Sequence, residues 1–453
     1  MRTGSLFLAG IAAGLLSLCS SAETVVRTQT VTVTGEENPQ ESPSPEQQEK
    51  AISAEKHDNI HIAKVPDVPP PSREALEASF RKAASFLLPR QNKDGSWGDH
   101  TGTKGLNVLC PYPQGPRSFR LASTALCIVG LTASPLHDDP AIQNAVDKAL
   151  NVLIRELPKL KRGDTITLLS TWAHAYGLEA YCSAAKRLPK DSPRFQELKE
   201  AAAKAIHATD LLSDEAYGGW GYYTFDVFSQ KTIGMPTSFL TSTVLLAYKD
   251  AKDIFGLDSD PNVLKRAVKL LKALRTPAGT FVYSRDHMYY GTAPINRHTG
   301  SLARNPAGDM AIMSFDPGFV TLTQLEDNVE RLWSRDGWLY MALKKPVPHE
   351  SFAQNAGYFF YYGYYYAART FDWLPKEHLP RHAAQLSEDI LHLQEKDGCW
   401  WDYPLYNYHK FYGTGYALYS MSRVWDVLQG STIPFTVESP HAAGTTVSSS
   451  PAS

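Results

Sequence analysis

Apolar residues recur at spacings of three and four along most of the chain, which is the pattern of helices that bury one face. The first such segment follows Ser72, a residue suited to cap a helix, and runs to Leu88. A second, more uniformly apolar segment follows at 121–133. Alternating patterns, which indicate strands, are scarce. The pattern therefore predicts an all-α protein.

This pair of segments recurs along the chain, and each pair is joined by a turn that contains glycine and an aromatic residue. The turn aromatics are Trp97, Trp220, Phe281, Trp338 and Trp400. They lie about 60 residues apart, and in one case about twice that, with a degenerate turn at 161–164 near the middle of the double interval. Amphipathic first helices alternate with apolar second helices, which indicates two concentric layers. Six helix–turn–helix repeats of about 60 residues predict an α6/α6 toroid.

The two ends of the chain do not share this pattern. Residues 1–22 combine Arg2, an apolar run and small residues before Ala22, as a secretory signal does, so we expect export to the periplasm or beyond. Lipidation of Cys19 is the alternative, but Leu18 before it is bulkier than a lipoprotein signal favours.

Between the signal and the repeats, residues 23–71 are rich in Pro and Glu, and residues 429–453 are rich in Ser and Thr. Both segments are poor in core-forming residues, so we predict disorder for them and a folded toroid over 72–428. No later stretch is long and apolar enough to predict a transmembrane anchor. The oligomeric state stays open.

Composition narrows the choice of partner. The net charge of −2 in 453 residues predicts no electrostatic binding of nucleic acid. The 23 Tyr and 9 Trp exceed what a disordered chain contains. We therefore expect a small-molecule ligand, a lipid or a glycan, in a centre lined by rings.

The turn motif at 91–97, QNKDGSW, followed by an apolar helix, resembles the repeat of squalene and oxidosqualene cyclases and of protein prenyltransferase β subunits. Other segments resemble exported bacterial proteins with prenyltransferase/squalene-oxidase repeats: 170–177, 218–222, 357–366 and 413–418. The resemblance implies a terpenoid-cyclase-like toroid with an isoprenoid-like or other apolar ligand in its central cavity.

Two chemistries of these families can be compared with the residues. Class II cyclases protonate an alkene with an Asp-x-Asp-Asp motif, and the nearest segment, Asp258-Ser259-Asp260-Pro261, reads instead as the start of a helix. Protein prenyltransferases hold zinc with an Asp-x-Cys pair and a His. Asp397 and Cys399 match the pair, but His409 precedes the aligned helix, so we expect no cofactor and keep zinc as the alternative. A disulfide between Cys110 and Cys399, which would clamp repeats one and six, is another use of Cys399.

Candidate functional residues come from two regions. The long polar loop 285–304 and an apolar helix supply possible acid–base and anion-binding groups: Asp286, His287, His298, Arg304 and His174. The aromatic run at 358–366 and its counterparts supply possible ligand-binding rings: Trp172, Tyr223, Phe360, Tyr361, Tyr364 and Tyr365. A structural role in the core is the alternative for each of these residues.

Three classes of function remain open. The first is an isoprenoid-binding or cyclase-like protein without the Asp-rich acid. The second is a carbohydrate-active lyase or hydrolase on an α6/α6 scaffold, and the third is a non-catalytic exported binding or scaffold protein. An apolar cavity would favour the first, convergent Arg, His and Tyr the second, and a filled centre the third.

Overall fold

The computed structural model describes residues 65, 67–103, 113–162, 166–224, 232–334 and 336–429. The predicted signal peptide with Cys19, nearly all of the 23–71 linker and the tail from 430 lie outside the described residues. Within the described residues the secondary structure is helical, and extended pairing is limited to isolated β-bridges such as that of Thr167 with Tyr223. No helix in these ranges is both long enough and apolar enough to cross a membrane.

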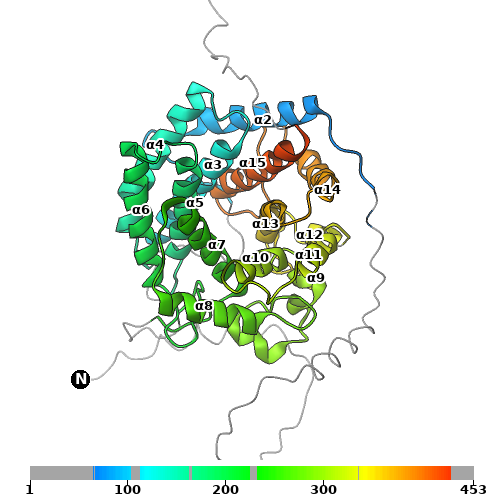
Figure 1. Ribbon diagram of the computed structural model, residues 1–453. Coiled ribbons are helices and arrows are strands. Elements are labelled where there is room, and N and C mark those ends of the chain that lie inside the picture. The colour runs from blue at the N-terminus through cyan, green and yellow to red at the C-terminus, as the bar shows by residue number, and fades with distance from the viewer. Residues whose placement is uncertain are drawn as a thin grey trace, which may run out of the picture. The chain divides into compact units, whose positions relative to one another are not determined.

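Two layers of helices surround a common axis (Figure 1). The outer helices are α2 (Arg73–Leu87), α4 (Pro140–Glu156), α6 (Pro193–Asp210), α8 (Pro261–Leu274), α11 (Leu322–Ser334) and α14 (Leu379–His392). The inner helices are α3 (Gln114–Ala133), α5 (Ser170–Ala185), α7 (Ser238–Phe255), α10 (Asn305–Phe315), α13 (Phe360–Arg369) and α15 (Tyr408–Leu428). The α6/α6 toroid predicted from the sequence is thereby confirmed.

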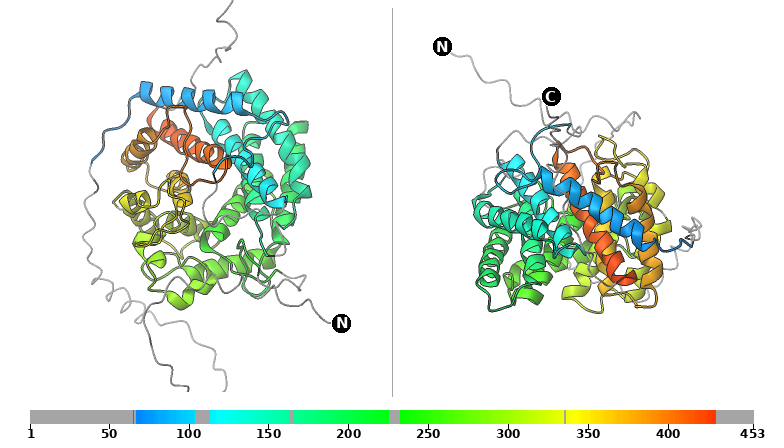
Figure 2. Two further views of the ribbon diagram at one scale, coloured as in Figure 1. Left: turned by 180° about the vertical axis from the view of Figure 1, so that it is seen from behind. Right: turned by 90° about the horizontal axis from the view of Figure 1, so that it is seen from above.

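Short helices connect the layers: η2 (Leu88–Arg90), η3 (Leu157–Lys159), η4 (Arg285–Tyr290), η5 (Pro294–Asn296), α9 (His298–Ser301), α12 (Asp336–Tyr340), η6 (Gly357–Phe359) and η7 (Thr370–Asp372). Each inner helix packs on the next, and α15 packs on α3, so the inner ring closes. In the views of Figure 2, α2 lies along the outside of α15, which joins the last repeat to the first. The Gln394 side-chain amide donates to the Ser79 carbonyl of α2 at 3.0 Å and completes this seam.

The repeated turn holds the two layers together. The ring N–H groups of Trp97, Trp220 and Trp400 donate to carbonyls near the ends of the preceding outer helices, at 2.9, 2.8 and 2.7 Å. Their backbone N–H groups are bound by threonine hydroxyls of the following inner helices, at 2.9 to 3.1 Å. Gly95 has a φ of +97° and a Cβ there would lie 2.9 Å from the Lys148 carbonyl oxygen, so the turn requires glycine. The turn tryptophans are therefore scaffold, as their pattern indicates.

The fifth repeat departs from the prediction. Asp336-Gly337-Trp338, which we expected to form a turn, forms the short helix α12. Trp338 is partly exposed and stacks on Phe352 at 5.2 Å instead of anchoring under the next repeat. The nearby Trp333 is buried and donates to His382 of α14, which ties α11 to its neighbouring outer helix. The prediction of a turn at this position was wrong. The anchoring contact to the neighbouring repeat is made instead by Trp333 of the outer helix α11.

Other local predictions have clear outcomes. Asp260 caps α8 by accepting from the backbone N–H groups of Asn262 and Val263, so its segment is the start of a helix, as predicted. Cys399 is a buried free thiol, while its expected disulfide partner Cys110 lies outside the described residues. The structure therefore gives no support to a clamp through Cys399.

Candidate functional site

Several inner helices begin at the same end of the ring. Trp172, in the first turn of α5, stacks on Phe239, in the first turn of α7, at 5.9 Å, and Phe239 meets Phe359, just before α13, at 5.1 Å. Partly exposed aromatic and histidine side chains gather at this end, which we call the mouth: Trp172, Tyr222, Tyr223, His287, His349, Tyr358 and Tyr412.

Two pairs of polar side chains meet in the mouth. The hydroxyls of Tyr222 and Tyr283 are 2.5 Å apart, and the Tyr358 hydroxyl lies 3.4 Å from Nε2 of His349. The ring of Tyr283 lies 5.4 Å from that of His349, which brings the two pairs together. Three repeats, the third, fourth and fifth, thus contribute to one connected group.

The protonation state of His349 follows from its second nitrogen. Nδ1 lies 2.7 Å from the Gln354 carbonyl oxygen, which can only accept, so Nδ1 carries the hydrogen and Nε2 presents a lone pair to Tyr358. Burial lowers the pKa of His349 to about 4, so the ring is neutral at pH 7. Nε2 of this neutral ring is therefore a fixed hydrogen-bond acceptor directed at a hydroxyl.

A second histidine also packs against Tyr283. The His287 ring is 5.0 Å from the Tyr283 ring, and the His349 ring is 5.4 Å from it. Nδ1 of His287 is 2.7 Å from the Ser284 hydroxyl. The side chain of Asn296 donates to the backbone carbonyls at both ends of the His287–Tyr290 segment, which fixes η4 against the ring. Burial, and then the charge of Arg304, lower the pKa of His287 as well.

Arg304 lies beneath these residues and is 1% exposed. Its guanidinium donates to three backbone carbonyls, those of Gly300, Phe281 and Ile295, at 2.9, 3.1 and 2.6 Å. Burial lowers its pKa to about 10, which leaves it positively charged at pH 7. The mouth therefore has a fixed cation below a layer of neutral rings.

A buried carboxyl group completes the mouth on the side of the sixth repeat. Asp402 is fully buried, accepts from the Tyr412 hydroxyl at 2.8 Å and accepts from the backbone N–H of Tyr361 at 3.1 Å. Burial raises its pKa to about 7. Tyr412 separates this titratable group from the surface.

A hollow of about 650 Å³ lies beside the mouth, where the first and sixth repeats meet. Its lining includes Trp401, Tyr406, Asn407 and Lys410. Tyr403 connects the two regions, because its ring lies 5.5 Å from that of Tyr358 and its hydroxyl donates to the carbonyl of Pro346, another lining residue.

The structure brings together part of the site predicted from the sequence. Trp172, Tyr223 and His287 lie in the mouth, and Arg304 lies beneath it. The remaining acid–base candidates lie apart from this group. Asp286 is exposed on η4 beside Arg285, His298 is partly exposed at the start of α9, and His174 is buried within α5 with a pKa that burial lowers to about 4.

The four rings chosen from the aromatic run are buried and do not reach the surface of the mouth: Phe360, Tyr361, Tyr364 and Tyr365. Phe360 stacks on Tyr364, whose hydroxyl bonds Asp389 of an outer helix. The Tyr365 hydroxyl donates to Glu179 at 2.7 Å inside the ring. Tyr358 is the residue of this run that lies in the mouth, because it precedes α13 rather than belonging to it.

Sequence reasoning missed several members of the mouth. Tyr222, Tyr283 and Asp402 each lie two residues after a turn aromatic, so their common register was a usable signal. His349 lies in an irregular segment without any motif, and no pattern pointed to it.

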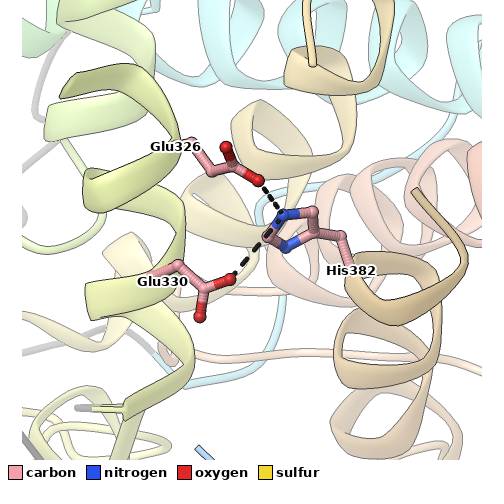
Figure 3. Close-up of side chains that lie close together, drawn as sticks. All are labelled: Glu326, Glu330 and His382. Atoms are coloured by element: carbon pink, nitrogen blue, oxygen red, sulfur yellow. Dashed lines mark hydrogen bonds and ion pairs between the residues drawn. The ribbon is translucent and has the colours of Figure 1, made fainter. Parts of the chain in front are cut away.

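The predicted zinc ligands do not come together. Asp397 accepts from the backbone N–H of Cys399 and from Lys410, Cys399 is buried, and the His409 ring packs on Trp401 at 5.1 Å. Within the described residues, a different group has metal-like spacing. It consists of Glu326, Glu330 and His382 (Figure 3), whose ligand atoms lie within 4.8 Å of one another.

The contacts of this second group favour a salt-bridge cluster over a metal site. Trp333 donates to Nδ1 of His382, so neutral His382 carries its hydrogen on Nε2, the nitrogen that faces both carboxylates. Nε2 lies 3.1 Å from Glu326 and 3.8 Å from Glu330. His378 and Arg381 bind the same two carboxylates. A metal at Nε2 would have to displace that hydrogen. The cluster links α11 to α14.

Comparisons with known proteins support the fold. No family model matches the chain, and no curated protein matches it. Similar solved structures include a D-mannose isomerase, with 13% identity and a TM-score of 0.51 over 79% of this chain and 97% of that one. A cellobiose 2-epimerase from Spirochaeta thermophila has 15% identity and a TM-score of 0.49, and the match covers 80% of this chain and 100% of that one. Type II terpene cyclase MstE from Scytonema has 13% identity and a TM-score of 0.43, and the match covers 79% of this chain and 99% of that one. At 13% identity the likeness to the mannose isomerase is one of fold alone, and it agrees with the α6/α6 toroid that the helices of this chain form.

Proposed function

We propose that the chain binds a small hydroxyl-rich molecule, of the saccharide class, at the mouth. The observation that carries the proposal is the convergence of phenol hydroxyls, imidazole nitrogens and one tryptophan ring at partly exposed positions from several repeats. Binding sites for small polar molecules combine flat aromatic surface with a few fixed hydrogen-bonding groups. Trp172 supplies such a surface, and Tyr222 and Tyr358 supply hydroxyls.

The same groups are suited to hold a bound ligand by hydrogen bonds. His349 is held in one tautomer with its basic nitrogen toward Tyr358, and it is neutral at pH 7. Its Nε2 therefore accepts a hydrogen bond, while the hydroxyls of Tyr222 and Tyr358 can both donate and accept one. His287, whose ring lies 5.0 Å from that of Tyr283, is the second imidazole of the mouth.

An isoprenoid ligand would meet little exposed apolar surface at the mouth. Phe239 and Phe359, the purely apolar rings beside the mouth, are 2% and 1% exposed. The partly exposed residues have polar tips instead. This distribution favours a ligand with hydroxyl groups over a hydrocarbon chain.

Ligand-observed NMR with D-glucose, cellobiose, D-glucuronate and geranylgeraniol tests the proposal on the purified protein. We expect saccharide binding that is lost in Trp172→Ala. Trp373→Ala is the matched control, because Trp373 is also partly exposed but follows the C-terminal end of α13, away from the mouth. Binding of geranylgeraniol without any saccharide would overturn the proposal.

A further inference from the structure

The position of Arg304 is electrostatically unfavourable in the absence of an anion. Arg304 is the N-cap residue of α10, so its positive charge belongs to the residue at the positive end of that helix's dipole. The side chain is 1% exposed, so water does not screen it. A cation with this placement requires compensation from elsewhere.

Two other arginines with little exposed side chain, Arg275 and Arg369, have carboxylate partners. Arg275 binds the buried Asp309 at 2.7 Å, and Arg369 binds Glu179 and Asp250, both at 2.8 Å. Within the described ranges, Arg304 has no ion pair with a carboxylate, and its Nε atom is buried without a hydrogen-bond partner. Three carbonyl dipoles hold the guanidinium in place, but they do not neutralise it.

The groups between Arg304 and the mouth are neutral. The guanidinium carbon lies 5.3 Å from the centre of the Tyr283 ring and 5.4 Å from that of Phe359. Beyond them lie His287 and His349, which are uncharged at pH 7. In such a weakly polarisable region the field of a fixed charge extends over several ångströms. At both histidines the charge of Arg304 acts more strongly than that of the opposing carboxylate, which is Asp286 for His287 and Glu350 for His349. The mouth is therefore electropositive at these two rings, without having a cation on its surface.

We infer that the mouth selects an anionic ligand, a saccharide that carries a carboxylate, whose charge is balanced by Arg304 across the Tyr283 ring. This inference rests on the proposed function and narrows its ligand class. Arg304 acts as a positioning residue: it holds no ligand atom itself, but it determines the sign of the charge that the mouth accepts.

The test compares matched ligands on the intact protein. Isothermal titration with D-glucuronate, its neutral methyl ester and D-glucose should give binding of the acid at least tenfold tighter than that of either neutral sugar. Equal affinities would overturn the inference and leave the proposed function standing. Failure of all three sugars to bind would overturn both, and so would binding of geranylgeranyl diphosphate alone.

Two variants locate the origin of the preference. Arg304→Met should abolish the preference for the acid and raise the pKa of His287 and His349 in NMR titrations, whereas Arg304→Lys should retain part of the preference. Arg285→Met is the control, since Arg285 lies on the nearby η4 and its guanidinium rests on the rings of Tyr217 and Tyr289. Loss of the preference in Arg285→Met instead would contradict the assignment to Arg304. If Arg304→Met does not fold, the wild-type comparison of acid and ester decides.

Discussion

The two ends of the inner helix ring use the same residue types in different ways. Each end contains a buried arginine surrounded by tyrosines. Toward the C-terminal ends of α5 and α13, Arg369 binds Glu179 and Asp250, and the Tyr365 hydroxyl binds Glu179 as well. At the mouth, the contacts of Arg304 with the part of the chain that the structure describes are to carbonyls and aromatic faces.

This difference separates a structural network from a candidate binding site. At the far end, hydroxyls and charges satisfy one another, as with Tyr366, which donates to Thr243 at 3.0 Å. At the mouth, the side chains are partly exposed, and Arg304 has no carboxylate partner among the described residues. Buried charges are normally paired, so the end with the uncompensated charge is the better candidate for function.

The largest contrast is expected for the two arginines. Arg369→Met leaves the carboxylates of Glu179 and Asp250 without a cation and should lower the free energy of unfolding by about 3–5 kcal/mol. Arg304→Met removes an uncompensated charge as well as its hydrogen bonds. It should therefore lower the free energy of unfolding by less than half as much as Arg369→Met. Guanidinium denaturation at pH 7 measures both. Equal losses would mean that the two arginines play the same structural role.

The second contrast concerns pH and the buried carboxyl group of the mouth. Because burial raises the pKa of Asp402 to about 7, the folded protein holds this proton more tightly than the unfolded chain, which releases it near its ordinary pKa. The free energy of unfolding should therefore fall as the pH rises from about 4 to about 7, by up to ~1.4 kcal/mol per unit from this group.

Asp402→Asn removes this contribution while keeping an oxygen acceptor for Tyr412. Urea denaturation of the two proteins at several pH values isolates the slope, because all other groups cancel in the difference. A difference that does not change with pH would show that Asp402 ionises normally in the folded state.

The smallest effects are expected for a matched pair of tyrosines. Tyr365→Phe removes a 2.7 Å bond to a carboxylate and should cost about 1.5–3 kcal/mol of stability. Tyr358→Phe removes a longer bond to a neutral imidazole and should cost less than ~1 kcal/mol. For saccharide binding the order should reverse, with only Tyr358→Phe weakening it. If Tyr365→Phe weakens binding equally, the two ends are not distinct in function.

The ring itself was predictable because most repeats carry the same local chemistry. The glycine and aromatic residue of the turn, and the contrast between amphipathic and apolar helices, are visible in single repeats and recur at a fixed period. The fifth repeat was mispredicted because Trp338 keeps the motif while its neighbour Trp333 makes the anchoring contact. The motif marks a position at which an aromatic residue can pack under the next repeat. The packing of the neighbouring helices determines which aromatic residue makes that contact.

The site was predictable only in part, since it depends on helix rotation and on irregular segments. The aromatic run at 358–366 contains a ring at almost every position, so sequence alone does not show which ring reaches the mouth. The answer depends on η6, which places Tyr358 before the helix while Phe360 and Tyr361 turn into the interior. His349 is positioned by a bond to the Gln354 carbonyl, which no side-chain pattern records.

The most direct test of the mouth as the functional end is an NMR titration of the histidine-labelled protein with D-glucuronate. We expect the ring nitrogen signals of His349 and His287 to shift, while that of His382, which lies between the outer helices α11 and α14, stays in place. Arg304→Met should reduce the shifts at the same ligand concentration. If the histidines of the mouth do not respond while the protein binds the ligand, the binding site lies elsewhere and the mouth is not the functional end of the ring.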